Sequence, residues 1–215
     1  AAATSLGDWN VGVSGSLRWS GEYKPFSDGN DPDFKYQPGV EGRIRLGVDR
    51  LVGKSRFALG GTFSTFANDQ LTGSGSGGSA TYSPGNRVLV DASFVAPTGN
   101  GTVSVYAWNY HRFRSSSSDG TIGGRENILA GGVAGAFPLS PKLSVEPMVE
   151  ARLWSPESGK GTLVGAGTGL RIQLSPALAF VPSVRADVGS VRPGSAAASS
   201  SVFGWDASGM LRYTF

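Results

Sequence analysis

Apolar and small residues alternate with polar residues along almost the whole chain. After Asp8, for example, Trp9, Val11 and Val13 fall on one side of an extended chain and the residues between them fall on the other. A period of two is typical of a β-strand with one apolar and one polar face. Ten segments carry this pattern, at 8–20, 39–50, 56–66, 86–95, 102–113, 126–137, 143–154, 162–174, 178–189 and 202–215. The pattern therefore predicts an all-β protein of ten antiparallel strands.

The connections between these segments alternate in length. Those that follow the odd-numbered segments are long or polar and span 20–38, 67–85, 114–125, 155–161 and 190–201. Those that follow the even-numbered segments are short turns with the sequences LVGKS, APTGN, PLSPK and SPA. A transmembrane barrel of bacterial outer membranes has long extracellular loops, short periplasmic turns and an even number of strands. The sequence thus predicts a transmembrane, up-and-down β-barrel that forms a single domain over 1–215.

The amphipathic pattern continues to the last residue. Leu211, Tyr213 and Phe215 share one face, while Arg212 lies on the other. With this final strand and its loop asymmetry, the chain resembles Gram-negative outer-membrane β-barrel proteins over essentially its whole length. The resemblance implies a bacterial outer-membrane location with both termini periplasmic. It also implies contact with outer-membrane lipids and lipopolysaccharide, and recognition of the C-terminal strand by the barrel-assembly machinery.

The first and last strands are expected to meet. An open strand edge inside a bilayer leaves backbone N–H and C=O groups without partners, which costs several kcal/mol for each group. We therefore expect the final strand, 202–215, to pair with the strand that starts at Trp9 and so to close the barrel.

Composition excludes several classes of site. The chain has no cysteine and a single histidine, His111, so neither cysteine chemistry nor a multi-histidine metal site is available. The net charge of +3 is modest, and no run of lysine or arginine points to nucleic acid as a partner. Hydrophobic residues make up 39% of the chain, which argues against disorder. We expect no metal ion and no other cofactor.

Aromatic residues recur at the two ends of the apolar faces. Trp9 and Trp19 are ten positions apart, which is roughly 25 Å along the membrane normal for a strand tilted by about 40°. That is the height of the apolar band between the two aromatic girdles of such barrels. The predicted girdle residues are Trp9, Trp19, Phe203, Trp205, Tyr213 and Phe215.

The opposite faces of the strands carry charges at mid-strand positions, where a dry core would not hold unpaired ions. All five lysines lie in loops or turns, so the cations on these faces are arginines, which favour fixed bidentate ion pairs. We therefore predict a lumen largely filled by an ion-pair network. Its fifteen members are Arg18, Glu41, Arg43, Arg45, Asp49, Arg87, Asp91, Glu146, Glu150, Arg152, Arg171, Arg185, Asp187, Asp206 and Arg212. Gly165, Gly167 and Gly169 share this face and leave room for a narrow wet passage.

Two non-enzymatic functions follow from such an interior. A filled lumen favours a barrel that binds a partner through its surface loops or anchors a larger envelope assembly. A residual passage favours a narrow, porin-like channel for ions or small solutes. At the expected extracellular rim, Arg112, Arg114 and Arg125 are candidates for contact with lipopolysaccharide phosphates.

A hydrolase at the rim is the third interpretation, and His111 is its candidate base. Omptin-type proteases are also ten-stranded barrels and use a His–Asp pair and an Asp pair at this rim. Here Asn109, not an aspartate, stands two positions before His111. The serines at 115–118 are near enough in sequence for the Ser–His pair of a lipid deacylase, but a serine run in a loop is usually only a loop. We therefore predict no catalytic residue.

Overall fold

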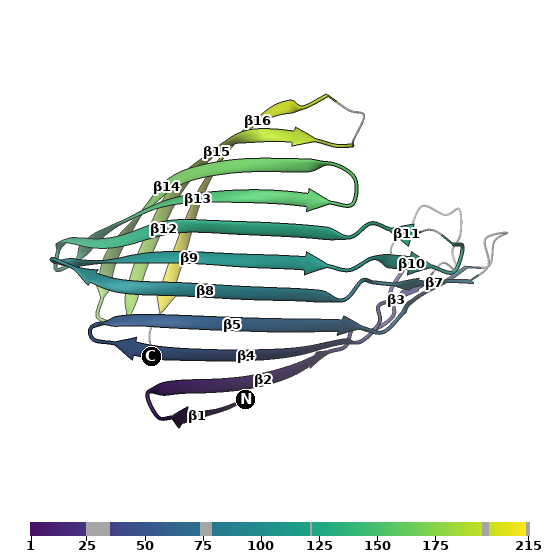
Figure 1. The fold of residues 1–215 in the computed structure, drawn as a ribbon, viewed down its shortest axis with the longest axis horizontal. Helices are drawn as coiled ribbons and strands as arrows, with labels where there is room; N and C mark the ends of the chain where they lie inside the picture. The colour runs from purple at the N-terminus through teal and green to yellow at the C-terminus, as the bar shows by residue number, and fades with distance from the viewer. Residues whose placement is uncertain (25–34, 74–78, 121, 195–197, 214–215) are drawn as a thin grey trace.

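The computed structural model describes residues 1–24, 35–73, 79–120, 122–194 and 198–213, and these residues form two antiparallel sheets (Figure 1). This confirms the all-β, antiparallel architecture predicted from the sequence. The main sheet has eleven strands in the order β1-β2-β4-β5-β8-β9-β12-β13-β14-β15-β16. They are β1 (Ala2–Leu6), β2 (Trp9–Arg18), β4 (Glu41–Val52), β5 (Ser55–Phe66), β8 (Arg87–Thr98), β9 (Gly101–Arg112), β12 (Glu126–Ser140), β13 (Leu143–Pro156), β14 (Lys160–Ser175), β15 (Leu178–Arg192) and β16 (Ser200–Tyr213). The described residues form no helix that is long and apolar enough to cross a membrane.

Each of the ten predicted segments forms one strand of the main sheet, but the predicted count of ten strands is wrong for this structure. The additional strand, β1, arises because Gly7 adopts a φ of 60°, which lets the first residues fold back onto β2 through a tight turn. Ala2 then pairs with Val13, and Leu6 pairs with Trp9. The remaining five strands lie within connections that the sequence predicts to be loops.

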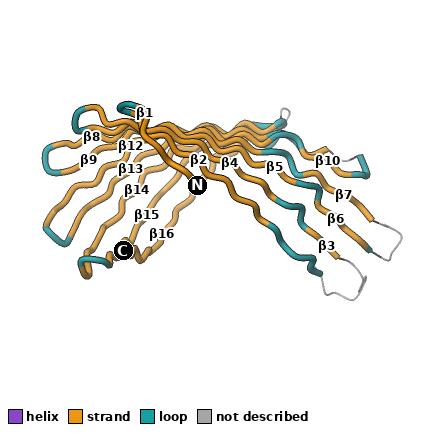
Figure 2. Tube along the Cα trace, turned by 90° about the horizontal axis from the view of Figure 1, so that it is seen from below, coloured by secondary structure: helices purple, strands orange, loops and turns teal. Residues whose placement is uncertain are grey.

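The main sheet is strongly curved but not closed (Figure 2). Strand β16 pairs with β15, and its other edge has no partner among the described residues. Strand β1 occupies the edge of β2 between Trp9 and Val13, where the sequence predicts the final strand. The expected pairing of the final strand with the strand that starts at Trp9 is therefore not present. A two-residue turn brings β1 to this edge at a much smaller loop-closure cost than a contact between the two ends of the chain.

Parts of the first three long connections form a second sheet of five short strands in the order β11-β10-β7-β6-β3. They are β3 (Lys35–Gln37), β6 (Asp69–Thr72), β7 (Ser79–Ser83), β10 (Ser115–Ser117) and β11 (Ile122–Gly123). Buried Asp69 ties this sheet to the segment that leads into β4, because it accepts hydrogen bonds from the Tyr36 hydroxyl at 2.5 Å and from the Gly39 N–H at 2.7 Å. Burial, followed by the hydrogen bond to Asp69, raises the pKa of Tyr36 above its ordinary value.

The described residues form almost no hydrophobic core. Among the described residues, only Ala130 and Ala179 are buried hydrophobic residues. Large apolar side chains are instead exposed across the whole width of the main sheet, from Leu17 (82% exposed) on β2 to Leu211 (68% exposed) on β16. A sheet in a globular domain covers its apolar face with another layer, and a contiguous exposed apolar face marks a surface for a membrane or a partner.

Candidate functional site

The pairing register gives each face of the main sheet its own character. Residues directly opposite each other in an antiparallel ladder point to the same face. One such row across five neighbouring strands consists of Ser16, Arg43, Ser64, Arg87 and Arg112. Along every ladder, the register places the fifteen charged residues of the predicted lumen on this same face, here called the polar face. The opposite face, here called the apolar face, carries exposed side chains that include Leu46, Phe63, Val90, Val133 and Val184.

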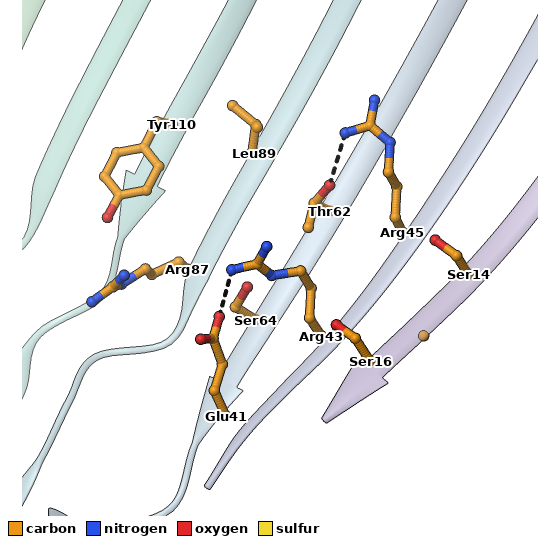
Figure 3. Close-up of a pocket in the computed structure, with 11 residues that line it drawn as sticks. Ser14, Ser16, Glu41, Arg43, Arg45, Thr62, Ser64, Arg87, Leu89 and Tyr110 are labelled. Atoms are coloured by element: carbon orange, nitrogen blue, oxygen red, sulfur yellow. Dashed lines mark hydrogen bonds and ion pairs between the residues drawn. The ribbon is translucent and has the colours of Figure 1, made fainter. Parts of the chain in front are cut away.

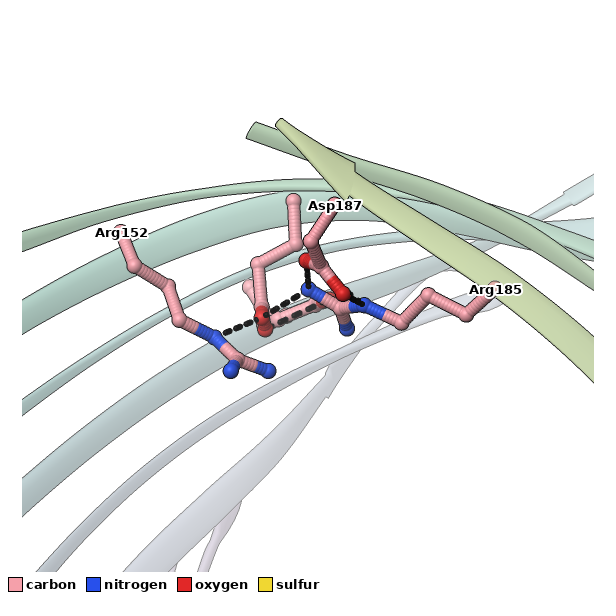
Figure 4. Close-up of polar contacts among 5 residues, drawn as sticks. Arg152, Arg185 and Asp187 are labelled. Carbon is pink, nitrogen blue, oxygen red and sulfur yellow. Dashed lines mark hydrogen bonds and ion pairs between the residues drawn. The ribbon is translucent and has the colours of Figure 1, made fainter. Parts of the chain in front are cut away.

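The most buried charge on the polar face is Glu150 of β13, which is 5% exposed (Figure 4). Its Oε1 atom accepts hydrogen bonds from Arg152 Nε at 2.5 Å and from Arg185 Nη2 at 3.2 Å. Its Oε2 atom accepts a hydrogen bond from the Tyr106 hydroxyl at 3.0 Å. Arg185 also donates to Asp187, with Nη2 and Oδ1 2.7 Å apart. These five residues, called the Glu150 cluster, link strands β9, β13 and β15.

Glycines make room for the Glu150 cluster. A Cβ atom at Gly165 would collide with the Asp187 carboxylate and the Arg185 guanidinium, and one at Gly132 would lie 2.7 Å from the Tyr106 hydroxyl. The sequence predicts that Gly165 leaves space for a narrow wet passage. In the structure, the side chains of Arg185 and Asp187 on β15 occupy that space.

A second polar site lies on the other half of the polar face, over β2, β4, β5, β8 and β9 (Figure 3). It is a hollow of about 540 Å³, called the arginine hollow, and it is open to solvent on one side. Arg43 donates to Glu41 at 2.7 Å, and Arg45 Nη1 lies 3.4 Å from Thr62 Oγ1. The residues that line it are Ser14, Gly15, Ser16, Glu41, Arg43, Arg45, Thr62, Ser64, Arg87, Leu89 and Tyr110.

The rest of the predicted network is brought together only in part. Arg45 Nη2 lies 3.3 Å from Asp91 Oδ1, and Asp49 accepts a hydrogen bond from Arg56 at 3.1 Å. Six predicted members have no hydrogen bond or ion pair through their side chains in the described part of the chain: Arg18, Arg87, Glu146, Arg171, Asp206 and Arg212. The described residues contain no group of three or more His, Cys, Asp or Glu placed to hold a metal ion.

Several participants on the polar face were not predicted from the sequence, among them Tyr106, Arg56 and Glu126. Tyr106 lies in the segment 102–113, where the alternation is ambiguous, so its face could not be assigned from the pattern. Arg56 stands at the first position of its predicted strand, and its pairings with Leu51 and Val95 fix it on the polar face. Tyr106 and Arg56 both stand at even-numbered positions, like the other polar-face residues of their strands, and this spacing could have indicated their face.

The described girdle residues within strands lie on the apolar face, with Trp9 and Tyr213 at strand ends and Trp205 near the middle of β16. Trp9 is partly exposed and packs edge-on against Phe57, with the ring centroids 6.3 Å apart. Trp19 follows directly after β2 and is 71% exposed. On β16, Phe203, Trp205 and Tyr213 are also exposed. Phe215 lies outside the described residues.

His111 lies on the apolar face near the end of β9, where it pairs with Val88 and Asn127. Its ring packs edge-on against Phe113, with the ring centroids 4.7 Å apart. Among the described residues, His111 has no hydrogen-bond or ion-pair partner. The structure therefore does not bring this histidine together with a carboxylate or a serine, as either hydrolase chemistry requires.

The three rim arginines form different contacts. Arg112 lies on the polar face, with Nε 3.6 Å from Glu126 Oε2, and Arg114 forms an ion pair with Glu157. The backbone N–H of Arg125 donates to the same Glu157 at 3.1 Å. The hydrogen bond from Arg114, with that from Arg125, holds the pKa of Glu157 below its ordinary value. Contact of these arginines with lipopolysaccharide stays a prediction.

Comparisons with known proteins identify the kind of fold. No protein-family model matches the chain, and no curated protein matches it. The outer-membrane expressed OmpT of Vibrio cholerae is similar in structure, with a TM-score of 0.54 and 13% identity over 84% of this chain. This chain spans 60% of the length of that OmpT chain. The beta domain of the Bordetella autotransporter BrkA aligns over 96% of this chain and 98% of its own length, with 17% identity and a TM-score of 0.38. The likeness to OmpT confirms the resemblance of this fold to outer-membrane β-barrels.

The Glu150 cluster generates a stability prediction. Glu150→Ala leaves the guanidinium groups of Arg152 and Arg185 without their shared carboxylate, and breaking a buried ion pair from one side costs about 3 kcal/mol. We expect a loss of this size in the free energy of unfolding, measured by urea titration in detergent with tryptophan fluorescence. Glu146→Ala, on the same strand and face but without an ion pair, is the matched control and should change little. Equal effects of both substitutions would contradict the assignment.

Proposed function

We propose that this chain forms the membrane-spanning wall of a bacterial outer-membrane β-barrel with no enzymatic activity. The observation that carries the proposal is the division of the main sheet, over the middle of its strands, into an exposed apolar face and a charged polar face. In this arrangement the apolar face contacts lipid and the polar face lines the interior. The fold likeness to OmpT supports the same interpretation.

The orientation follows from the two ends of the sheet. The short turns face the periplasm, together with the two termini, and the second sheet stands on the extracellular side. Outer-membrane lipids and lipopolysaccharide surround the barrel, and its last strand engages the barrel-assembly machinery. The second sheet presents the surface for an envelope partner, which fits a surface-binding or anchoring role. The Glu150 cluster supports this role because it fills the interior over β9, β13 and β15.

In the membrane, we infer that β16 replaces β1 at the edge of β2 and closes a single barrel domain of ten strands. Strand β1 has five residues, whereas a strand needs about nine to eleven to cross the bilayer. It runs antiparallel to β2 and would therefore lie parallel to β16. Direct pairing of β2 with β16 gives the antiparallel contact and the even strand number that such barrels have.

Pairing of β2 with β16 would place opposite charges next to each other, namely Arg18 on β2 and Asp206 on β16. Through the register of the sheet, Asn10 of β2 lies on the same row as Gly204 of β16. Closing ten strands at a tilt of about 35–40° requires a stagger of roughly ten to twelve residues. Such a stagger brings Arg18 opposite or diagonal to Asp206 on the polar face, within reach of an ion pair.

Lipid contact of the apolar face is testable with single cysteines, because the natural chain has none. Phe63 and Thr62 are neighbours on β5 and lie on opposite faces. In proteoliposomes, a spin label on Phe63→Cys should be accessible to oxygen and shielded from a water-soluble nickel chelate. A label on the matched Thr62→Cys should show the reverse. Equal access of the nickel chelate to both labels would contradict the membrane-spanning arrangement.

Closure of the barrel is testable by a charge exchange. Arg18→Asp and Asp206→Arg each place like charges side by side in the closed form and should each lower the free energy of unfolding by about 1 kcal/mol. The double variant should recover most of this loss, which urea titration in detergent measures. In the open sheet the two residues lie on opposite edges (Figure 1). Additive effects without recovery would show that β2 and β16 do not pair.

A narrow channel is the second candidate, and the arginine hollow favours it because that half of the interior is not filled by side chains. Planar-bilayer recordings of such a channel should show discrete openings, and Arg43→Ala should shift their ion selectivity away from anions. Arg171→Ala, a polar-face change outside the hollow, should leave selectivity unchanged. Absence of openings from protein whose insertion is verified by the cysteine labels would exclude the channel.

A further inference from the structure

We propose that the arginine hollow is a binding site for an oxyanion, namely a phosphate or carboxylate group carried by a small polar solute. The inference rests on the proposed function, because the hollow faces the interior of the barrel only when the sheet spans the membrane. It deepens that function by naming the class of ligand that the interior selects. A volume of about 540 Å³ lies within the range of pockets for small molecules.

The charge balance of the hollow is positive. Three arginines line it, Arg43, Arg45 and Arg87, and Glu41 is the one acid among the described residues that line it. Arg43 pairs with Glu41, and Arg45 pairs with Asp91, which lies outside the lining. Two of the three guanidinium charges in the lining are therefore not balanced by a carboxylate within it.

Of the three arginines that line the hollow, Arg87 is the one without a carboxylate partner in the described part of the chain. It has no ion pair in the described part of the chain, and its guanidinium lies 4.6 Å from the centroid of the Phe66 ring. A cation over an aromatic face keeps its N–H donors free at the edges of its plane. The fork of donors on Arg87 is thus available to a planar or tetrahedral oxyanion.

The register alternates these guanidinium groups with hydroxyl groups. Ser16, Arg43, Ser64 and Arg87 form one row on neighbouring strands. Arg43 and Arg87 are thus two strand spacings apart, or about 10 Å, so that their long side chains can converge on a ligand between them. Figure 3 shows the guanidinium of Arg43 extending toward the side of the hollow where Arg87 lies. Hydroxyl donors complete the hydrogen bonds to oxyanion oxygens that two arginines leave open.

The arginines of the hollow are more exposed and have fewer carboxylate partners than Arg185 of the Glu150 cluster, so they are the ones that can bind a ligand. Arg185 has a side chain that is 16% exposed, and two carboxylates accept its hydrogen bonds. Arg43 and Arg45 have side chains that are 52% and 51% exposed, each with a single carboxylate partner. The polar face therefore contains a buried arginine whose hydrogen bonds are taken by carboxylates, and exposed arginines that can still donate to a ligand.

Isothermal titration calorimetry on the full chain in a neutral, phosphate-free detergent tests this inference. Inorganic phosphate and citrate are the two probes, and they distinguish the phosphate from the carboxylate class. We expect saturable binding of at least one probe. Arg43→Gln and Arg87→Gln should each weaken it by about tenfold or more, as loss of a charge-assisted hydrogen bond predicts. Glu41→Gln removes the competing carboxylate and should strengthen it.

Arg171→Gln is the matched control, since Arg171 lies on the polar face outside the hollow and has no ion pair in the described chain. The Arg171→Gln variant should bind phosphate and citrate with the same affinity as the natural chain. Two results would overturn the inference: no saturable binding of either probe, or equal weakening by Arg87→Gln and Arg171→Gln. Lipid exposure is measured separately, on the labelled Phe63→Cys and Thr62→Cys proteins in proteoliposomes, because Thr62 lines the hollow and a label there would disturb anion binding. Normal lipid exposure without anion binding would contradict only the binding site, whereas anion binding without lipid exposure would contradict the membrane-spanning function instead.

Discussion

Backbone hydrogen bonding between neighbouring strands is the interaction on which the rest of this structure depends. With Ala130 and Ala179 as the buried hydrophobic residues of the described chain, no packed core sets the positions of the strands. The ladders do so, and from β2 to β16 their described register shifts only at Pro138/Ser140 and Gln173/Ser175, both close to short turns. Because side chains alternate with a period of two, this register also decides which face each residue occupies.

Once the register is set, the polar face divides into two parts with different electrostatic properties. Over β9, β13 and β15, glycines let long side chains lie flat on the sheet, so that Glu150 and Asp187 neutralise Arg185 in a buried cluster. Over β2 to β8, serine and threonine stand between the arginines, and fewer carboxylates face them. The first part links strands β9, β13 and β15 through buried ion pairs, and the second leaves the side chains of Arg43 and Arg45 about half exposed.

The two edges of the sheet show how local and distant contacts compete. Strand β1 reaches β2 through the turn at Gly7, at little entropic cost, whereas β16 lies at the other end of the chain. An open edge is solvated in water but not in hydrocarbon, where each unpaired backbone group costs several kcal/mol. The five residues of β1 cannot satisfy the edge of a spanning strand. In the membrane-spanning arrangement that we propose, the distant contact is therefore favoured over the local one.

The sequence by itself determined the ten long strands, the alternation of long and short connections between them and the face of almost every charged residue. These features depend on the alternation of apolar and polar residues and on turn residues within about a dozen neighbouring positions. Such local patterns can be recognised without knowledge of tertiary contacts. The tertiary structure alone decided which charges meet. Arg185 reaches Glu150 across an intervening strand, and Tyr106 joins them from a third strand. It also decided that Gly165 leaves no passage and that the first residues form a hairpin. The contacts of Glu150, Arg185 and Tyr106 depend on side chains brought together from distant parts of the chain. The alternation of apolar and polar residues cannot specify such contacts.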